Sequence, residues 1–282
     1  MDTAVQSIPL WAMALLLFAL LWCSAWVGRW LRKRINPGPA GGDSGLIVSS
    51  TLGLLALLLG FTVAMAVSRY DARRAATVAE ANAIGTLTYR ADMLPPAART
   101  ALLNGLAKYT GARIAVGRMG KSAADVQDAR ARSAVAAQAM WDGIMRVGPQ
   151  VPDTAVRILI VESANQMFDA GVVRDASLAN RLPSTLVLLL MLFPMASLVL
   201  VGYLRGDQAG AHLMASTELI LLLTLVLLLI ADLNRPRSGT IAIPVQPLVD
   251  ASQQIAEAQA RPSAAPVAVQ TTAAAAASAH TR

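Results

Sequence analysis

The chain has 282 residues, of which 55% are hydrophobic and 15% charged, and its formal net charge is +7. A soluble domain of this size carries nearer a quarter charged residues. The apolar excess gathers in four blocks, which excludes an ordinary soluble protein and indicates membrane-spanning helices. The basic residues lie mostly beside these blocks, where lipid headgroups attract them, and no basic stripe with interleaved aromatics suggests nucleic acid as a partner.

The first apolar block, residues 9–28, is long enough to cross about 30 Å of hydrocarbon. Tryptophans lie toward its ends, at Trp11, Trp22, Trp26 and Trp30. Basic residues follow the block at once and none precedes it, so we expect a retained membrane helix rather than a signal peptide. The only cysteine, Cys23, lies inside the block, which excludes an intrachain disulfide.

A second predicted span, residues 46–67, follows a linker rich in proline and glycine. One face of this span carries small residues spaced by three or four, namely Ser49, Gly53, Ala56, Gly60 and Ala64. Small side chains let helix backbones approach closely in lipid. The simpler interpretation is that this stripe packs helices within one subunit, and the alternative is that it forms an oligomer seam or lines a pore.

The helical pattern continues past the second span into polar sequence. Ala-rich sequence with an apolar stripe runs on to Pro95-Pro96, so a single helix over residues 46–93 would be about 70 Å long, more than twice the hydrocarbon thickness. Charged residues crowd its polar part, among them Arg69, Asp71 and Arg73. They are expected to form a solvated face, or salt bridges to neighbouring helices that are each worth little; the alternative is an electropositive vestibule that collects anions.

Further helices are predicted over residues 97–118 and 123–147, and over a third segment that Asp153 opens as N-cap. Membrane spans follow at residues 183–204, with Pro194 as a kink, and at 212–233. No credible alternating strand appears. The predicted fold class is all-α, with four transmembrane helices and a helical extramembrane bundle inserted between spans 2 and 3.

This pattern divides the chain into six segments. They are a first span with its linker (1–45), a second span continued as a long helix (46–94), the bundle (95–182), the third and fourth spans (183–234), a post-membrane segment (235–255) and an Ala/Pro-rich tail expected to be disordered (256–282).

Few residues suggest chemistry. The run at residues 115–122 ends in Gly120-Lys121-Ser122 like a phosphate-binding loop, but the pattern around it has no strand to precede it, so we interpret it as a turn between helices. Two histidines and one cysteine make no metal-ligand pattern, and no nucleophile arrangement stands out. We therefore expect no enzyme activity, no metal and no cofactor.

Two carboxylates in the fourth span attract attention because charges inside a membrane are costly. Glu218 and Asp232 are fourteen residues apart and fall within about 40° of one face. The simpler interpretation puts both carboxylates near the lipid headgroups, with Asp232 pairing with Arg235 or Arg237. The alternative is an ion or proton path along that face.

Residues 58–95 and 227–248 resemble the bestrophin-like membrane proteins, a class described as a domain of unknown function. The most specific part of this similarity is the set Asp232, Arg235, Pro236, Arg237 and Gly239. The resemblance implies four spans and an extramembrane helical domain. It also implies a distant kinship with bestrophins, which are pentameric chloride channels with a cytosolic helical part; no acidic cluster resembles their calcium site.

Orientation is predicted differently by charge and by resemblance. The loops at residues 29–44 and 205–211 carry five basic residues in short segments, which favours their side as cytoplasmic and places the bundle outside. Kinship with bestrophins instead places the bundle in the cytosol.

The leading hypothesis is a multi-pass protein of the inner (plasma) membrane that acts as a homo-oligomeric ion channel or channel-like transporter for small ions. The long second helix would line or frame the path, with Gly60 and Phe61 near mid-membrane. The alternative is a non-conducting membrane scaffold or sensor whose helical domain binds a partner.

Overall fold

The computed structural model describes residues 9–35, 44–118, 123–205, 211–235 and 240–262. Within these ranges every regular element is a helix, and the order is α2 (Leu10–Ile35), α3 (Ser44–Arg90), η1 (Ala91–Met93), α4 (Pro96–Arg118), α5 (Ala123–Val147), η2 (Gly148–Gln150), α6 (Thr154–Ala179), α7 (Ser184–Arg205), α8 (Ala211–Leu233) and α9 (Gln246–Ala260).

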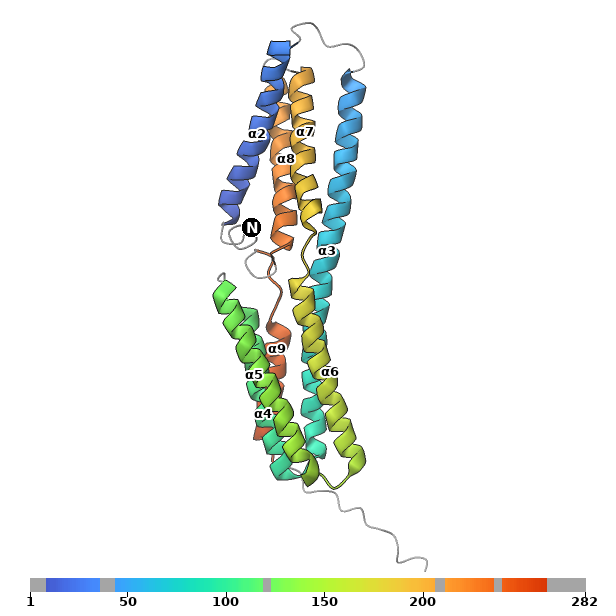
Figure 1. Cartoon of the computed structure of the whole chain (residues 1–282), viewed down its shortest axis with the longest axis vertical. Coiled ribbons are helices and arrows are strands. Elements are labelled where there is room, and N and C mark those ends of the chain that lie inside the picture. The colour runs from blue at the N-terminus through green and yellow to red at the C-terminus, as the bar shows by residue number, and fades with distance from the viewer. Residues whose placement is uncertain (1–8, 36–43, 119–122, 206–210, 236–239, 263–282) are drawn as a thin grey trace, which may run out of the picture.

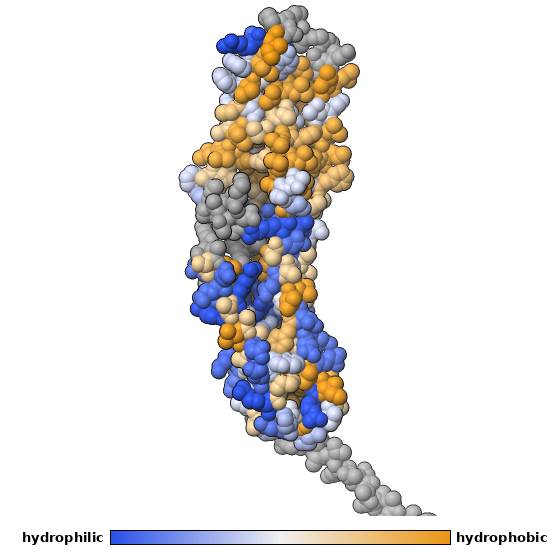
Figure 2. Space-filling model, in the orientation of Figure 1, coloured by the Kyte–Doolittle hydropathy of each residue, from blue (hydrophilic) through white to orange (hydrophobic). Residues whose placement is uncertain are grey.

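The helices form two stacked halves that share one element (Figure 1). The upper half contains α2, α7, α8 and the first part of α3, and its surface is mostly hydrophobic (Figure 2). The lower half contains α4, α5, α6, α9 and the rest of α3, and its surface is mostly hydrophilic. Four helices in the described ranges are long and apolar enough to cross a membrane. The predicted fold class is confirmed.

The shared element, α3, is an unbroken helix of 47 residues. Hydroxyl groups along it donate to carbonyls one turn back: Thr62 to Leu58 at 2.7 Å and Thr77 to Arg73 at 3.1 Å. Such internal bonds suit a helix in lipid, which offers no hydrogen-bond partners. The continuous rod predicted from sequence is therefore present, and it ends at η1, just before the double proline.

In the membrane half, α7 and α8 lie between α2 and α3 (Figure 1). Large aliphatic side chains fill the space among the four helices, with Leu21, Leu55, Leu198 and Ile220 each at most 2% exposed. Because these positions repeat at helical spacing on each helix, one face of each helix is buried while the opposite face remains open to lipid.

The α2–α7 contact depends on two glycines. A Cβ atom at Gly28 would lie 2.0 Å from the carbonyl oxygen of Val199, and one at Gly202 would lie 2.2 Å from that of Ala25. The two backbones thus touch directly, which is the kind of approach that small residues permit in membranes.

The extramembrane bundle has its own core. Ile84, Leu87, Leu103, Leu106 and Met167 are fully buried there. The predicted N-cap of α6 is confirmed, because the Asp153 carboxylate accepts hydrogen bonds from the backbone N–H of Ala155 at 2.7 Å and of Val156 at 3.4 Å. This cap satisfies donors that the first turn of a helix leaves free.

The expected start of the disordered tail at Ala256 is wrong, because α9 continues to Ala260. Leu248, Ala251, Ile255 and Ala258 recur at helical spacing and are at most 3% exposed in the bundle core. Their burial stabilises a helix that Ala-rich composition alone did not reveal. Residues 263–282 of the predicted tail lie outside the described residues.

Buried arginines close two helix ends. Arg32 of α2 donates to the carbonyls of Tyr203 at 3.1 Å and Leu204 at 3.3 Å, at the end of α7. Arg99 of α4 donates to the carbonyl of Ala258 at 2.6 Å, at the end of α9. Both place a positive charge where the last turn leaves carbonyl oxygens without intrahelical partners.

Replacing Gly202 by leucine should destabilise the protein, because the new side chain meets the backbone of α2 rather than a movable side chain. Overpacking costs about 1–3 kcal/mol, and we expect an apparent melting temperature lower by at least about 5 °C in detergent. Gly111→Leu is the matched control, since Gly111 is exposed on α4 and a Cβ atom there meets nothing within 4 Å. Equal melting temperatures for the two variants would contradict the proposed backbone contact.

Candidate functional site

The small-residue stripe of α3 lies on the face that no other helix of the described residues covers. Ser49, Gly53, Ala56, Gly60 and Ala64 are all exposed, and a Cβ atom at Gly53 or Gly60 would meet nothing within 4 Å. The opposite face is buried, through residues such as Val48, Leu55, Thr62 and Ala66. The interpretation that the stripe packs helices within one subunit is therefore wrong, and the seam or pore-lining alternative stays a prediction.

Phe61 lies beside the stripe and is 68% exposed. Leu57 and Met65, also on the open side of α3, are exposed as well. The outward face of α3 thus combines small residues with a few large apolar side chains, of which Phe61 is the only aromatic one in the stretch from Ser44 to Val67.

The charged residues that crowd α3 beyond the membrane segment do not share one environment. Asp71 and Arg74 are exposed, Arg69 is half-buried, and Arg73 is only 1% exposed. Glu80 is completely buried. These residues therefore do not form a single solvated face: a helix with one packed face turns part of this charge into the interior, where Glu80 makes the other expected kind of contact, salt bridges to neighbouring helices.

Arg73 joins three helices where the two halves of the molecule meet. Its guanidinium donates to the carbonyls of Ser177 at 3.2 Å and Asn180 at 2.5 Å, at the end of α6, and to that of Leu233 at 2.9 Å, at the end of α8. The contact closes the C-terminal ends of α6 and α8 together, as Arg32 and Arg99 close those of α7 and α9.

The short link between α6 and α7 is held at every residue that precedes Pro183. Arg69 donates to the side-chain oxygen of Asn180 at 2.5 Å and to the carbonyl of Arg181 at 2.6 Å. The backbone N–H of Leu182 donates to the Asn234 side chain at 3.0 Å. Residues from α3 and from the end of α8 thereby fix the turn at which the chain re-enters the membrane.

Asp232 has a structural partner that the sequence did not suggest. Its carboxylate accepts hydrogen bonds from the backbone N–H of Thr240 at 2.8 Å and of Ile241 at 3.1 Å. The chain that follows α8 thus folds back over the carboxylate, which is 6% exposed. Arg235 is buried nearby and its charge interacts with that of Asp232; Arg237 lies outside the described residues.

Glu218 does not share this setting, because it is exposed on α8. The two carboxylates do fall near one helical direction, but the returning segment at Thr240 covers that direction at Asp232. One open face through both carboxylates is therefore interrupted, and a role for Glu218 in ion movement stays a prediction.

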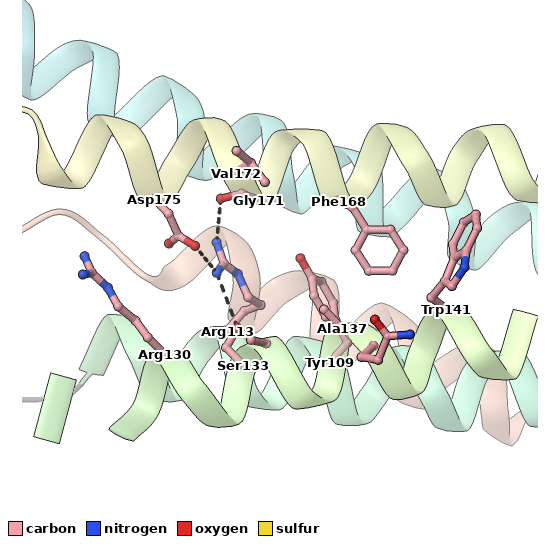
Figure 3. Close-up of a pocket in the computed structure, with 12 residues that line it drawn as sticks. Tyr109, Arg113, Arg130, Ser133, Ala137, Trp141, Phe168, Gly171, Val172 and Asp175 are labelled. Atoms are coloured by element: carbon pink, nitrogen blue, oxygen red, sulfur yellow. Dashed lines mark hydrogen bonds and ion pairs between the residues drawn. The ribbon is translucent and has the colours of Figure 1, made fainter. Parts of the chain in front are cut away.

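Glu80 is the centre of a buried ion network in the helical bundle. Its carboxylate oxygens accept from Arg113 at 2.5 Å and from Arg174 at 2.9 Å, and the Tyr109 hydroxyl donates to it at 3.2 Å. Arg113 also donates to Asp175 at 2.8 Å and to the Gly171 carbonyl at 3.0 Å (Figure 3). The network ties α3 to α4 and α6.

The burial of this network determines the protonation states of Tyr109 and Arg113. Burial, and then the charge of Glu80, raise the pKa of Tyr109 above its ordinary value. Burial lowers the pKa of Arg113, but the hydrogen bond that it donates to Asp175 and the charge of Glu80 outweigh this effect, so the pKa of Arg113 is raised. Tyr109 is therefore neutral and Arg113 charged at any physiological pH.

A cavity of about 430 Å³ opens beside this network, between α4, α5 and α6 (Figure 3). Aromatic rings line one end, where Phe168 makes edge contacts with Tyr109 at 5.7 Å and with Trp141 at 6.2 Å between ring centres. The guanidinium of Arg113 lies toward the other end but donates to protein oxygens instead of pointing into free space. The network therefore stabilises the packing of the helices and does not form a ligand-binding group in the cavity.

Glu80, Arg113 and Arg174 were not singled out as a group from the sequence. A signal does exist: Arg73, Thr77 and Glu80 are spaced by four and three on the face of α3 that also carries its buried alanines, Ala66 and Ala76. The turn expected over residues 115–122 falls partly outside the described residues, since α4 ends at Arg118. Within the described residues no group of three or more His, Cys, Asp or Glu side chains gathers as a metal site.

Comparison with known proteins gives a consistent result for fold. The family model for the bestrophin-like domain matches residues 15–248. No curated protein matches the chain. A crystal structure of a bacterial bestrophin homologue from Klebsiella pneumoniae, phased on zinc, is 13% identical with a TM-score of 0.63, over 89% of this chain and 98% of that one. A point variant of the same homologue gives a TM-score of 0.64 at 13% identity, over 88% and 98% of the two chains.

Replacing Glu80 by alanine should destabilise the bundle strongly, because it leaves Arg113 and Arg174 buried without their shared carboxylate. Removing one partner of a buried ion pair costs about 3–5 kcal/mol. The exposed pair of Asp128 and Arg132, at 2.8 Å, is the matched control, and Asp128→Asn should cost less than about 0.5 kcal/mol. Thermal unfolding of the two purified variants tests the difference; similar losses in both would show that the network carries no special weight.

Proposed function

This chain belongs to the bestrophin-like family, and on that premise we propose that it is an oligomeric ion channel or channel-like transporter whose path is framed by the outward face of α3. In this proposal the protein is embedded in the lipid bilayer, it assembles with further copies of the same chain, and it transports small ions. The long helix would continue the path from the membrane half into the extramembrane half.

The observation that carries the proposal is the contrast between α3 and its neighbours. The open face of α8 presents large side chains to lipid, such as Leu221, Leu222 and Leu225. The open face of α3 also carries large side chains, such as Leu57, but places Gly53, Gly60 and other small residues in a stripe among them. Leucine-rich faces suit acyl chains, whereas small residues suit close approach of another helix or space for water. A second copy of the chain, or a path between copies, fits this face better than lipid does.

The same face stays open where α3 leaves the membrane. Asp71 lies on this face, and Arg74 follows Asp71 by less than one helical turn; both side chains are exposed. In an assembly of several copies, these side chains would repeat around the mouth of the path and act on ions that enter it. Phe61, the large aromatic residue beside the stripe, would be a constriction within the membrane.

Ion flux into liposomes that contain the purified protein tests the proposal. Cysteines placed at Gly53, Gly60 or Ala64, with Cys23→Ala as background, should react with a water-soluble cationic thiol reagent, and the reaction should lower flux by about tenfold or more. Leu55→Cys is the matched control, because Leu55 is 2% exposed against the other membrane helices. Flux no greater than in empty liposomes would favour the alternative, a non-conducting scaffold or sensor.

We also propose that the helical bundle lies in the cytoplasm, as the kinship with bestrophins implies. In intact bacterial cells that express the Cys23→Ala protein, a membrane-impermeant maleimide should label Ile35→Cys, at the far end of α2, and spare Val135→Cys, on exposed α5. Both positions should react after the cells are opened. The reverse pattern would support the charge-based expectation, which places the bundle outside.

A further inference from the structure

A second cavity, of about 640 Å³, lies at the end of the bundle farthest from the membrane half. It opens where α5 ends, where η2 turns the chain and where α6 begins (Figure 1). Helix α5 packs along α4 and touches α6 only sparsely, so the two helices leave this space between them. A volume of this size is typical of sites that bind small molecules.

The cavity has an apolar floor and an apolar mouth. Five of its lining side chains are buried and at most 5% exposed: Leu94, Leu102, Ile144, Val151 and Ile160. Met145 and Ile158 also line the cavity, and they are 43% and 60% exposed although both are large and apolar. An apolar group that enters would remove the surface of these side chains from water, which favours its binding.

Arg157 is the cationic side chain of this cavity. Its stem lies against η2, because a Cβ atom at Gly148 would be 3.7 Å from the Cδ atom of Arg157. Within the described residues its guanidinium donates one hydrogen bond, to the hydroxyl of Thr154 at 3.1 Å, and joins no ion pair. A guanidinium has five N–H donors, so most of them remain for a ligand.

The acids nearest to Arg157 in the sequence have other partners. The Asp153 carboxylate accepts from backbone N–H groups of the first turn of α6. Glu162 lines the cavity about 140° farther around the helix and accepts from Gln166 at 3.4 Å. Arg157 itself lies in the first turn of α6, where the helix dipole disfavours a positive charge. An anionic group fits this position, because it would pair with Arg157 and with the positive end of the dipole.

We propose that this cavity binds a single-chain amphiphile with a carboxylate head, of the medium-chain fatty acid class. Arg157 would donate a forked pair of hydrogen bonds to the carboxylate, and the chain would lie on the apolar floor. The cavity is at the hydrophilic end of the molecule, away from the apolar surface of the membrane half, so the ligand arrives from the aqueous side (Figure 2). The site does not depend on whether the protein conducts ions.

Photolabelling of the full-length protein in phosphatidylcholine nanodiscs tests this site. The probe is dodecanoic acid with a diazirine near the end of its chain, and mass spectrometry identifies the labelled peptides. Residues 144–161 should be labelled in the wild type. Decanoate should compete with the probe, and decanol and decyltrimethylammonium should compete at least about tenfold less well. Arg157→Gln should lower the labelling about tenfold, because the hydrogen bonds to a charged group are lost.

Arg146→Gln is the matched control, because Arg146 is an exposed basic residue of α5 that does not line the cavity. This variant should be labelled like the wild type. Val161→Trp tests the apolar part of the site separately, since an indole would fill space that the chain of the ligand needs; it should also lower the labelling. It keeps the test open if Arg157→Gln fails to fold, which thermal unfolding of each variant would reveal.

Three results would overturn the proposal. One is equal labelling of the wild type and of folded variants with a changed cavity. Another is equal competition by decanol and decanoate, which would describe an apolar cavity that does not recognise a carboxylate. The third is labelling confined to α2, α7, α8 and the first part of α3, which would assign the probe to the bilayer.

Discussion

The last turn of every helix leaves carbonyl oxygens without intrahelical partners, and this constraint is severe in a protein whose helices end at a membrane surface. In this protein, arginines from neighbouring helices donate hydrogen bonds to these carbonyl oxygens. Arg32 closes α7, Arg73 closes α6 and α8 together, and Arg99 closes α9. Arginine suits the task because its planar fork reaches two carbonyls at once and it stays charged when buried. Part of the net charge of +7 is thus structural.

The same kind of contact, a side chain of one helix bound to the end of another, also determines how the two halves stack. Because α3 is one helix, any rotation about its axis in the membrane is carried into the bundle. Arg73 and Asn234 then fix how α6, α7 and α8 meet that helix, and Glu80 fixes α4 and α6 two turns farther along. Helix α3 has no hinge, and side chains on it form hydrogen bonds both at the junction of the two halves and within the bundle. The two halves are therefore constrained to move as one body.

Sequence reasoning reached the architecture because long apolar runs and prolines are local signals. The unbroken α3, the bounds of α5 and the Asp153 cap follow from periodicity and punctuation alone. It failed where burial depends on distant residues. The end of α9, residues 256–260, was assigned to the tail because the buried face of this helix has only two large side chains, Leu248 and Ile255, beside two alanines. Likewise the sequence suggested Arg235 or Arg237 as partners for Asp232 and no particular partner for Glu80, whereas Asp232 binds backbone N–H groups and Glu80 binds two arginines.

The division of charge on α3 bears on how ions would meet this protein. Within the bundle, Glu80 and Asp175 balance Arg113 and Arg174, so these four groups add little field beyond their surroundings. The field on the outward face then comes from Asp71 and Arg74, which oppose one another, and from the arginines of the junction behind them. Because the buried groups compensate one another, the two exposed residues on the open side of α3 would set the local charge that an ion meets where this face leaves the membrane.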